Sequence, residues 1–231
     1  MIVMIHQPEY LPWPGFFDKL YRSDLYVILD SVQFEMRGFQ NRNRIKTDDG
    51  WKWLTVPIVH SLGQRISGVK ISYQTTWREK HWEFLRKSYG RAQFFQKYSG
   101  FFRETYLKNW FLLSQLNIHM IKGLMSMLGI EKPLVLSSHL GVDGKATELL
   151  INICKEVGAD VYLSGTGGRE YLDLKRFADK NIKVKFREYS PPTYPQQYEK
   201  NGFIPYMSTV DLLFNCGEKS LDIILSGGKI I

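Results

Sequence analysis

The sequence of 231 residues predicts an α/β protein with a parallel, doubly wound sheet and a helical insertion in the middle of the chain. Short, continuously apolar runs in both halves of the chain are typical of buried parallel strands. Apolar and aromatic residues recur at helical spacing from about residue 76 to residue 130, and strand and helix patterns alternate on either side of that stretch. We expect residues 1–231 to form a single domain.

The first half of the chain begins with a strand, a short helix and a second strand. The strands are predicted for MIVMI (1–5) and DLYVILD (24–30), and the helix for FFDKLYRS (16–23). Two more strands, WKWLTVPIV (51–59) and GVKISY (68–73), are expected to pair through the polar turn between them.

The helical insertion is followed by a return of the alternating pattern. Gly90 and Gly129 are expected to end helices of the insertion. Further strands are predicted at 133–138, 159–165 and 182–189, with helices between them and one or two closing helices at 207–225. Ser208 and Asp211 fit the capping pattern of a closing helix, which is a structural role.

The composition of the chain indicates which kinds of partner the protein can bind. The chain carries 31 Lys and Arg against 23 Asp and Glu, a net charge of +8, which favours anionic partners such as phosphates or nucleotide-sugars. Apart from RGFQNRNRIK (37–46) and KNIKVKF (180–186) the basic residues are scattered, so a continuous nucleic-acid-binding stripe is not expected. Cys154 and Cys216 have no disulfide or metal-ligand spacing. We expect no membrane span and no leader, and hence a cytoplasmic location.

Candidate site residues are those that directly follow the predicted strands, because open α/β sheets bind ligands beyond the carboxyl ends of their strands. Such residues are His6 and Gln7, Asp30 with Gln33, Ser137 to His139, and Ser164 to Gly168. A histidine there is a candidate general base or phosphate donor, since imidazole titrates near neutral pH and has donor and acceptor nitrogens. The structural alternative is a buried histidine bonded to the backbone.

Two other stretches are candidate ligand contacts. SGTGGREYLD (164–173) is similar to a phosphate cradle, although its spacing matches neither dinucleotide-binding nor P-loop patterns and a steric glycine turn is the alternative. In QNRNRIKT (40–47) an extended chain would present asparagines on one side and arginines, which can clamp anions, on the other. The tyrosines and glutamines of YSPPTYPQQY (189–198) suit the wall of a sugar or nucleotide site or a structural turn.

The resulting binding candidates are Gln7, Tyr10, Gln33, Asn41, Arg42, Asn43, Arg44, Lys46, Ser164, Gly165, Gly167, Gly168, Tyr171 and Gln197.

The segments HQPEYLPWPGFFDKL, DLYVILDSVQF, NRNRIK, WLTVPI, YLSGTGGREYLD and STVDLLFNCG, in this order, resemble the WbqC-like family. That family is associated with surface-polysaccharide or O-antigen gene clusters, and transfer of glycine to an amino sugar has been suggested for it. A weaker likeness is to the nucleotidyltransferase superfamily that includes pantothenate synthetase, which adenylates a carboxylate and passes it to an amine. The HxGH signature of that superfamily is absent, since Pro14-Gly15-Phe16 stands where a Gly-His pair is expected.

Together these resemblances imply a transferase or ligase that attaches an amino acid or acyl group to the amine of a nucleotide-activated amino sugar. ATP, with Mg²⁺ as its counterion, is the implied cofactor. His6 would be a phosphate donor or the base, Asp30 would orient the amine, the 164–168 loop would hold the triphosphate, and Arg42, Arg44 and Lys46 would neutralise the sugar-linked diphosphate. The alternatives are an ATP-independent transferase that uses a preactivated donor, and a noncatalytic sugar-binding or scaffold protein.

Overall fold

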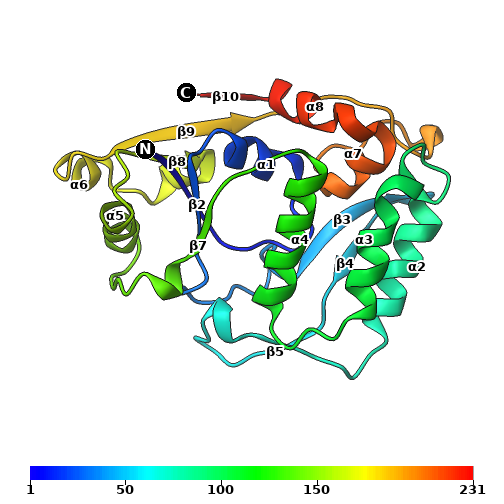
Figure 1. Cartoon of the computed structure of the whole chain (residues 1–231), viewed down its shortest axis with the longest axis horizontal. Coiled ribbons are helices and arrows are strands. Elements are labelled where there is room, and N and C mark those ends of the chain that lie inside the picture. The colour runs from blue at the N-terminus through cyan, green and yellow to red at the C-terminus, as the bar shows by residue number, and fades with distance from the viewer. Residues whose placement is uncertain (231) are drawn as a thin grey trace.

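The computed structural model describes residues 1–230 and has the expected α/β architecture (Figure 1). Its central sheet has six strands in the order β10-β9-β8-β1-β2-β7. All neighbouring strands are parallel except β10, which runs antiparallel to β9. The strands are β1 (Ile2–His6), β2 (Leu25–Ile28), β7 (Leu134–Leu136), β8 (Val161–Gly165), β9 (Lys183–Tyr189) and β10 (Gly228–Ile230).

Helices cover both faces of this sheet, as a doubly wound fold requires. Successive side chains of β1 point to opposite faces, so Met4 joins a core with α1 (Pro14–Tyr21) and α8 (Ser220–Ser226). Val3 on the other face joins a second core with α5 (Thr147–Glu156) and α6 (Leu174–Ala178). The continuously apolar character of β1 and β2 follows from this burial on both faces.

The order of the strands creates a switch point between β1 and β8. From β1 the chain moves to β2 and then to β7 on one side, and after α5 it crosses to β8 and continues to β9 on the other side. The connections that leave β1 and β8 therefore diverge to opposite faces of the sheet. This divergence opens a crevice at the carboxyl ends of the two strands, where ligands bind in folds of this kind.

The insertion between β2 and β7 contains the predicted helices α2 (Trp77–Tyr89), α3 (Phe95–Leu107) and α4 (Leu113–Met127). Gly129 ends α4 with φ of +68°, a conformation that glycine adopts without strain. The helices share the first core with α7 (Thr209–Cys216), through side chains such as Phe102 and Phe214. The Ser208 hydroxyl caps α7 by accepting from the Val210 N–H at 3.3 Å.

The predicted pairing of residues 51–59 with residues 68–73 is confirmed only for the last part of the first segment. Strand β4 (Gly50–Thr55) pairs with β3 (Arg42–Thr47), and the remainder of the predicted strand, β5 (Ile58–Val59), pairs separately with β6 (Lys70–Ile71). Pro57 divides the predicted strand, since it has no N–H for a ladder. None of the helices in residues 1–230 combines the length and the apolar character needed to cross a membrane.

Candidate functional site

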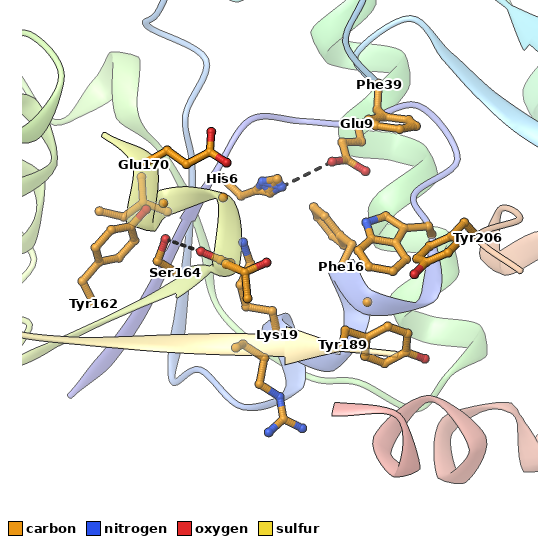
Figure 2. A pocket seen from close by; sticks show the side chains of 18 of the residues that line it. His6, Glu9, Phe16, Lys19, Phe39, Tyr162, Ser164, Glu170, Tyr189 and Tyr206 are labelled. Carbon is orange, nitrogen blue, oxygen red and sulfur yellow. Dashed lines mark hydrogen bonds and ion pairs between the residues drawn. The ribbon is translucent and has the colours of Figure 1, made fainter. Parts of the chain in front are cut away.

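A cavity of about 600 Å³ lies at the switch point, beyond the carboxyl ends of β1 and β8. Its walls come from the end of β1 and the loop after it, from α1, from β8 with the turn that follows, and from the end of β9 (Figure 2). A cavity of this size is in the usual range for small-molecule sites. Topology and volume therefore both indicate a ligand-binding site here.

His6 and Glu9 form a polar pair in this cavity. His6 is the last residue of β1, and its Nε2 lies 3.3 Å from Glu9 Oε1 (Figure 2). The imidazole stacks on the Phe16 ring of α1, with 5.4 Å between the ring centroids. Burial, followed by the charge of Lys19, lowers the pKa of His6 well below its ordinary value of 6.5, so the imidazole is neutral at pH 7.

Glu9 is a buried carboxyl group with an unused oxygen. Its residue is 6% exposed, and no described group donates to its buried Oε2 atom. Burial raises the pKa of Glu9 from 4.5 to about 7, against the opposing effect of the Lys19 charge. A carboxyl group that titrates near neutral pH suits proton transfer at that pH.

Lys19 supplies a buried amine to the same cavity, which it enters from α1 (Figure 2). The residue is 8% exposed, and within residues 1–230 no hydrogen bond or ion pair engages its Nζ. Burial lowers the pKa of Lys19 from 10.5 to about 8, an effect that the charge of Glu9 partly offsets. The amine is therefore mostly charged at pH 7 and can pair with an anionic ligand.

The turn after β8 forms the opposite wall. Gly165, Gly167 and Gly168 line the cavity, but only Gly168 is required by packing, because a Cβ there would overlap Ser164 Oγ. A Cβ on Gly165 or Gly167 would meet no atom within 4 Å. Neither glycine has a positive φ. Their lack of side chains thus keeps space open on the cavity side, as a close approach of ligand to backbone requires.

Aromatic rings complete the cavity. The Trp13 ring packs edge-on against Tyr189 at 5.2 Å and lies 5.7 Å from Tyr206, centroid to centroid. Gly15 permits this arrangement, since a Cβ at that position would overlap the Trp13 ring. The Arg44 guanidinium reaches the same wall and donates to the Tyr206 carbonyl at 3.2 Å. The wall can therefore bind a planar or sugar-like group next to a fixed positive charge.

Seven of the predicted site residues line this cavity. They are His6, Arg44, Ser164, Gly165, Gly167, Gly168 and Tyr171. They come from the end of β1, from β3, and from the end of β8 with the turn that follows it, three segments far apart in the sequence.

Asp30, predicted to orient the amine, lies outside the cavity. It is 3% exposed, and its carboxylate accepts from the Ser138 N–H at 2.9 Å, Ser138 Oγ at 2.8 Å and Ser137 Oγ at 3.1 Å. These bonds connect the end of β2 to the end of β7. Because both carboxylate oxygens accept hydrogen bonds and Asp30 does not line the switch-point cavity, its geometry is that of a structural crosslink.

The other predicted binding residues also have partners within the protein. The Asn43 amide donates to the Leu11 carbonyl at 2.8 Å, and the Tyr10 hydroxyl bonds to His81 Nδ1 at 2.8 Å. Lys46 Nζ donates to the Gly202 carbonyl. Four more predicted residues lie outside the cavity and form hydrogen bonds within the protein: Gln7 with Gln40, Asn41 with Val56, Arg42 with Arg37, and Gln197 with Asn215. Gln33 also lies outside the cavity; it is exposed and forms a backbone β-bridge with Arg65.

Glu9 and Lys19 are site residues that the sequence analysis did not single out. Glu9 follows His6 by three positions in a proline-rich loop, and Lys19 lies on a predicted helix, where lysine is usually solvated. The available signal was the segment HQPE itself, since an acidic residue soon after a strand-end histidine can reach the same edge of the sheet. For Lys19 only its burial, seen in the structure, distinguishes it.

The fold and the cavity define a doubly wound α/β protein with a small-molecule site at its switch point. The chain belongs to the WbqC-like protein family, whose sequence model matches residues 7–223. It is 36% identical over 225 residues to the Mycobacterium tuberculosis (strain ATCC 25618 / H37Rv) protein Rv1507c, described as uncharacterized, in an alignment that covers 95% of this chain and 96% of the relative. No solved structure matches this chain.

Proposed function

We propose that the protein is an amide-forming transferase or ligase that attaches an amino acid or acyl group to the amine of an amino sugar in surface-polysaccharide biosynthesis. The observation that carries this proposal is the buried Glu9 carboxyl group, with a pKa of about 7, beside a neutral His6 in the switch-point cavity. Amide formation from an amine and an activated carboxyl group needs a base for the ammonium proton, and Glu9 is suited to that role.

The reaction has two steps. A carboxylate oxygen of the donor attacks the α-phosphorus of ATP, which forms an acyl adenylate and releases pyrophosphate. The nitrogen of the sugar amine then attacks the acyl carbon, a C–N bond forms, the C–O bond to the adenylate breaks, and AMP leaves. Glu9 accepts the proton that the nitrogen loses. The cavity holds the reacting groups together and so lowers the entropic part of the barrier.

The residues around Glu9 have distinct proposed roles. His6 is held by the Phe16 ring, and its Nε2 positions the Glu9 carboxylate. The Lys19 ammonium neutralises charge on the phosphates. Gly165 and Gly167 admit the triphosphate close to the backbone, and Mg²⁺ accompanies it as counterion.

A second candidate function uses the same base with a preactivated donor, such as a thioester or a charged transfer RNA, and needs no ATP. The observation in its favour is the missing HxGH signature, because the loop after β1 has His6 followed by Gln7 and no histidine at the start of α1. In this version the acyl carbon still accepts the sugar amine, and Glu9 still accepts the proton.

Calorimetric titration of ATP into the protein and into the Ser164→Ala variant tests the first step. Incubation with ATP, glycine and a set of UDP-linked amino sugars, followed by mass spectrometry of the sugar product, tests the second. Glu9→Gln should lower the rate of amide formation about 10²- to 10⁴-fold, whereas the surface control Glu156→Gln should retain the wild-type rate. If the protein forms the amide from a thioester donor and does not bind ATP, the second candidate function is supported and the first is excluded. Sugar binding without any amide product, from either kind of donor, would leave a noncatalytic role and refute both.

A further inference from the structure

A surface of exposed aromatic rings and arginines lies on one side of the β3–β4 hairpin and is here termed the aromatic–arginine face. It consists of Phe39, Arg42, Arg44, Trp51 and Trp53. In the register of the hairpin Arg44 is opposite Trp53, and Arg42 is opposite Thr55, so these side chains share one side of the pleat. Phe39, Trp51 and Trp53 remain 42%, 42% and 37% exposed.

The arginines lie on the rings. Arg42 Cζ is 4.5 Å from the centroid of the Trp53 ring, and Arg44 Cζ is 5.2 Å from that of Trp51. Such pairs stabilise a hairpin to a modest extent. The hairpin is already anchored through its other side, where Ile45 and Leu54 are buried in the main core. Three large rings on the solvent side are therefore not needed to hold it, and clustered exposed rings are typical of binding surfaces.

The two guanidinium groups keep free donors at this surface. Each has five N–H bonds, and each uses one terminal nitrogen for a carbonyl, Arg42 for that of Arg37 and Arg44 for that of Tyr206. The Nε atom of each arginine is buried and has no acceptor among the described residues, so the donors free for a ligand at the surface are those of the terminal nitrogens. Two guanidinium groups held flat with unused donors match the geometry of phosphate oxygens.

The aromatic–arginine face is continuous with the switch-point cavity. Phe39 and Arg44 belong to the face and also line the cavity, and Phe39 lies next to Trp53, with 6.1 Å between the ring centroids. Figure 2 shows Phe39 on the same side of the cavity as Glu9. One ligand can therefore extend from the exposed rings, past Arg44, to the interior of the cavity.

We propose that the aromatic–arginine face binds the base and the diphosphate of a nucleotide-activated sugar, with the sugar extending into the cavity toward Glu9. The base stacks on the exposed rings, and Arg42 and Arg44 bind the diphosphate. This inference rests on the proposed function, since it identifies the acceptor of that reaction as a nucleoside diphosphate sugar. A single-stranded nucleic acid also uses rings and cations, but it needs a basic groove along several nucleotides. Outside RGFQNRNRIK (37–46), which contains Arg42 and Arg44, and KNIKVKF (180–186), the basic residues of this chain are scattered, which favours a single nucleotide.

The test is binding of UDP, ADP, GDP, CDP and dTDP, each titrated in turn and followed by tryptophan fluorescence and calorimetry. We expect at least one to bind and to quench tryptophan emission. Trp53→Ala should weaken that binding about five- to a hundredfold, in line with the usual contribution of one base stacked on an aromatic ring. Arg42→Ala should weaken binding of both the nucleotide and inorganic pyrophosphate. The controls Trp82→Phe and Arg86→Ala, which change a ring and a charge on α2, should bind as the wild type does.

Several outcomes would overturn the inference. They are no binding of any of the five nucleotides, equal binding by Trp53→Ala and wild type, or preferential binding of a ten-nucleotide RNA with a steep salt dependence. Trp53→Phe, which keeps a ring, should restore most of the affinity and so separates stacking from misfolding. Nucleotide binding without amide formation would refute the proposed function alone. Amide formation on a free amino sugar, with no nucleotide binding, would refute this inference alone.

Discussion

Two neighbouring strands of the sheet, β1 and β2, each end beside a buried carboxyl group, and the two groups differ in their partners. Asp30 after β2 receives hydrogen bonds from Ser137 and Ser138 on both of its oxygens and does not line the switch-point cavity. Glu9 after β1 has His6 at 3.3 Å from one oxygen, has no donor to the other, and lines a cavity of about 600 Å³.

The difference distinguishes a structural carboxylate from one available for chemistry. A carboxylate whose two oxygens already accept hydrogen bonds cannot bind a ligand without losing bonds that it already has. A buried carboxylate with a free oxygen is destabilised in its charged form. Its free oxygen can accept a proton or a hydrogen bond from the substrate. Position at the end of a strand is the same for both, so position alone does not identify function.

The largest expected effect is that of Glu9→Gln on the reaction. Loss of the base should lower the rate of amide formation about 10²- to 10⁴-fold, a typical contribution of general base catalysis. The rate of the wild type should rise with pH through about 7, as Glu9 ionises. The measurement is the pH profile of single-turnover product formation. A pH-independent rate between pH 6 and 8 in the wild type would exclude Glu9 as the base.

The same variant should become more stable relative to the wild type at high pH. The folded pKa of Glu9, about 7, exceeds the ordinary value of 4.5, so the stability associated with it is complete below pH 4.5 and is lost as the pH rises through 7. The loss is of the order of 3 kcal/mol. Urea unfolding of wild type and Glu9→Gln at pH 5 and pH 8 measures it, and an equal difference between the two proteins at both pH values would contradict it.

Asp30→Ala should reduce stability instead of catalysis. The change removes the Asp30 acceptor from the buried Ser137 hydroxyl and from the Ser138 N–H, at a cost of about 1–3 kcal/mol in the free energy of unfolding. The activity of the remaining folded protein, measured per folded molecule at low temperature, should stay within about threefold of wild type. A stable Asp30→Ala variant that is inactive would indicate that Asp30 takes part in the reaction. The proposed difference between Asp30 and Glu9 would then be wrong.

Lys19 should make the binding of anions depend on pH. Its pKa of about 8 means that the ammonium is lost as the pH rises above 8, so the affinity for ATP or pyrophosphate should fall about tenfold per pH unit there. Lys19→Met should bind these anions weakly at all pH values and remove the dependence. Calorimetric titrations at pH 7, 8 and 9 provide the test. A wild-type affinity that is constant over this range would exclude Lys19 as the anion contact.

The smallest effect is expected for the open glycines after β8. Gly167→Ala places its Cβ in empty space, so the free energy of unfolding should change by less than about 1 kcal/mol while ATP affinity falls severalfold. Gly100→Ala on α3, where a Cβ also meets nothing within 4 Å, is the matched control and should leave ATP affinity unchanged. Gly168→Ala should destabilise the turn, because its Cβ would overlap Ser164 Oγ.

Much of the fold was predictable because its signals are local. The apolar runs of β1 and β2, the helical spacing of residues 76–130 and the alternation after it all appear in the structure. The pairing of β4 with β3 was not predicted, because pairing depends on which strand is brought alongside, and Asn41 to Asn43 lack the residues that usually mark a strand. The likeness to the WbqC-like family, read from short segments, is confirmed by the family match over residues 7–223.

By itself the sequence determined the α/β class, the family, and the segments that end beside the site, including His6 and the 164–168 turn. The fold class, the family and these segments follow from the periodicity and the order of residues, both of which are present in the sequence itself. Only the tertiary structure decided that Glu9 and Lys19 are buried beside His6. It also decided that the Asp30 carboxylate accepts hydrogen bonds from Ser137 and Ser138. Burial and hydrogen-bond partners are set by residues distant in the chain. They raise the pKa of Glu9 and leave one of its oxygens without a donor, whereas both oxygens of Asp30 already accept hydrogen bonds.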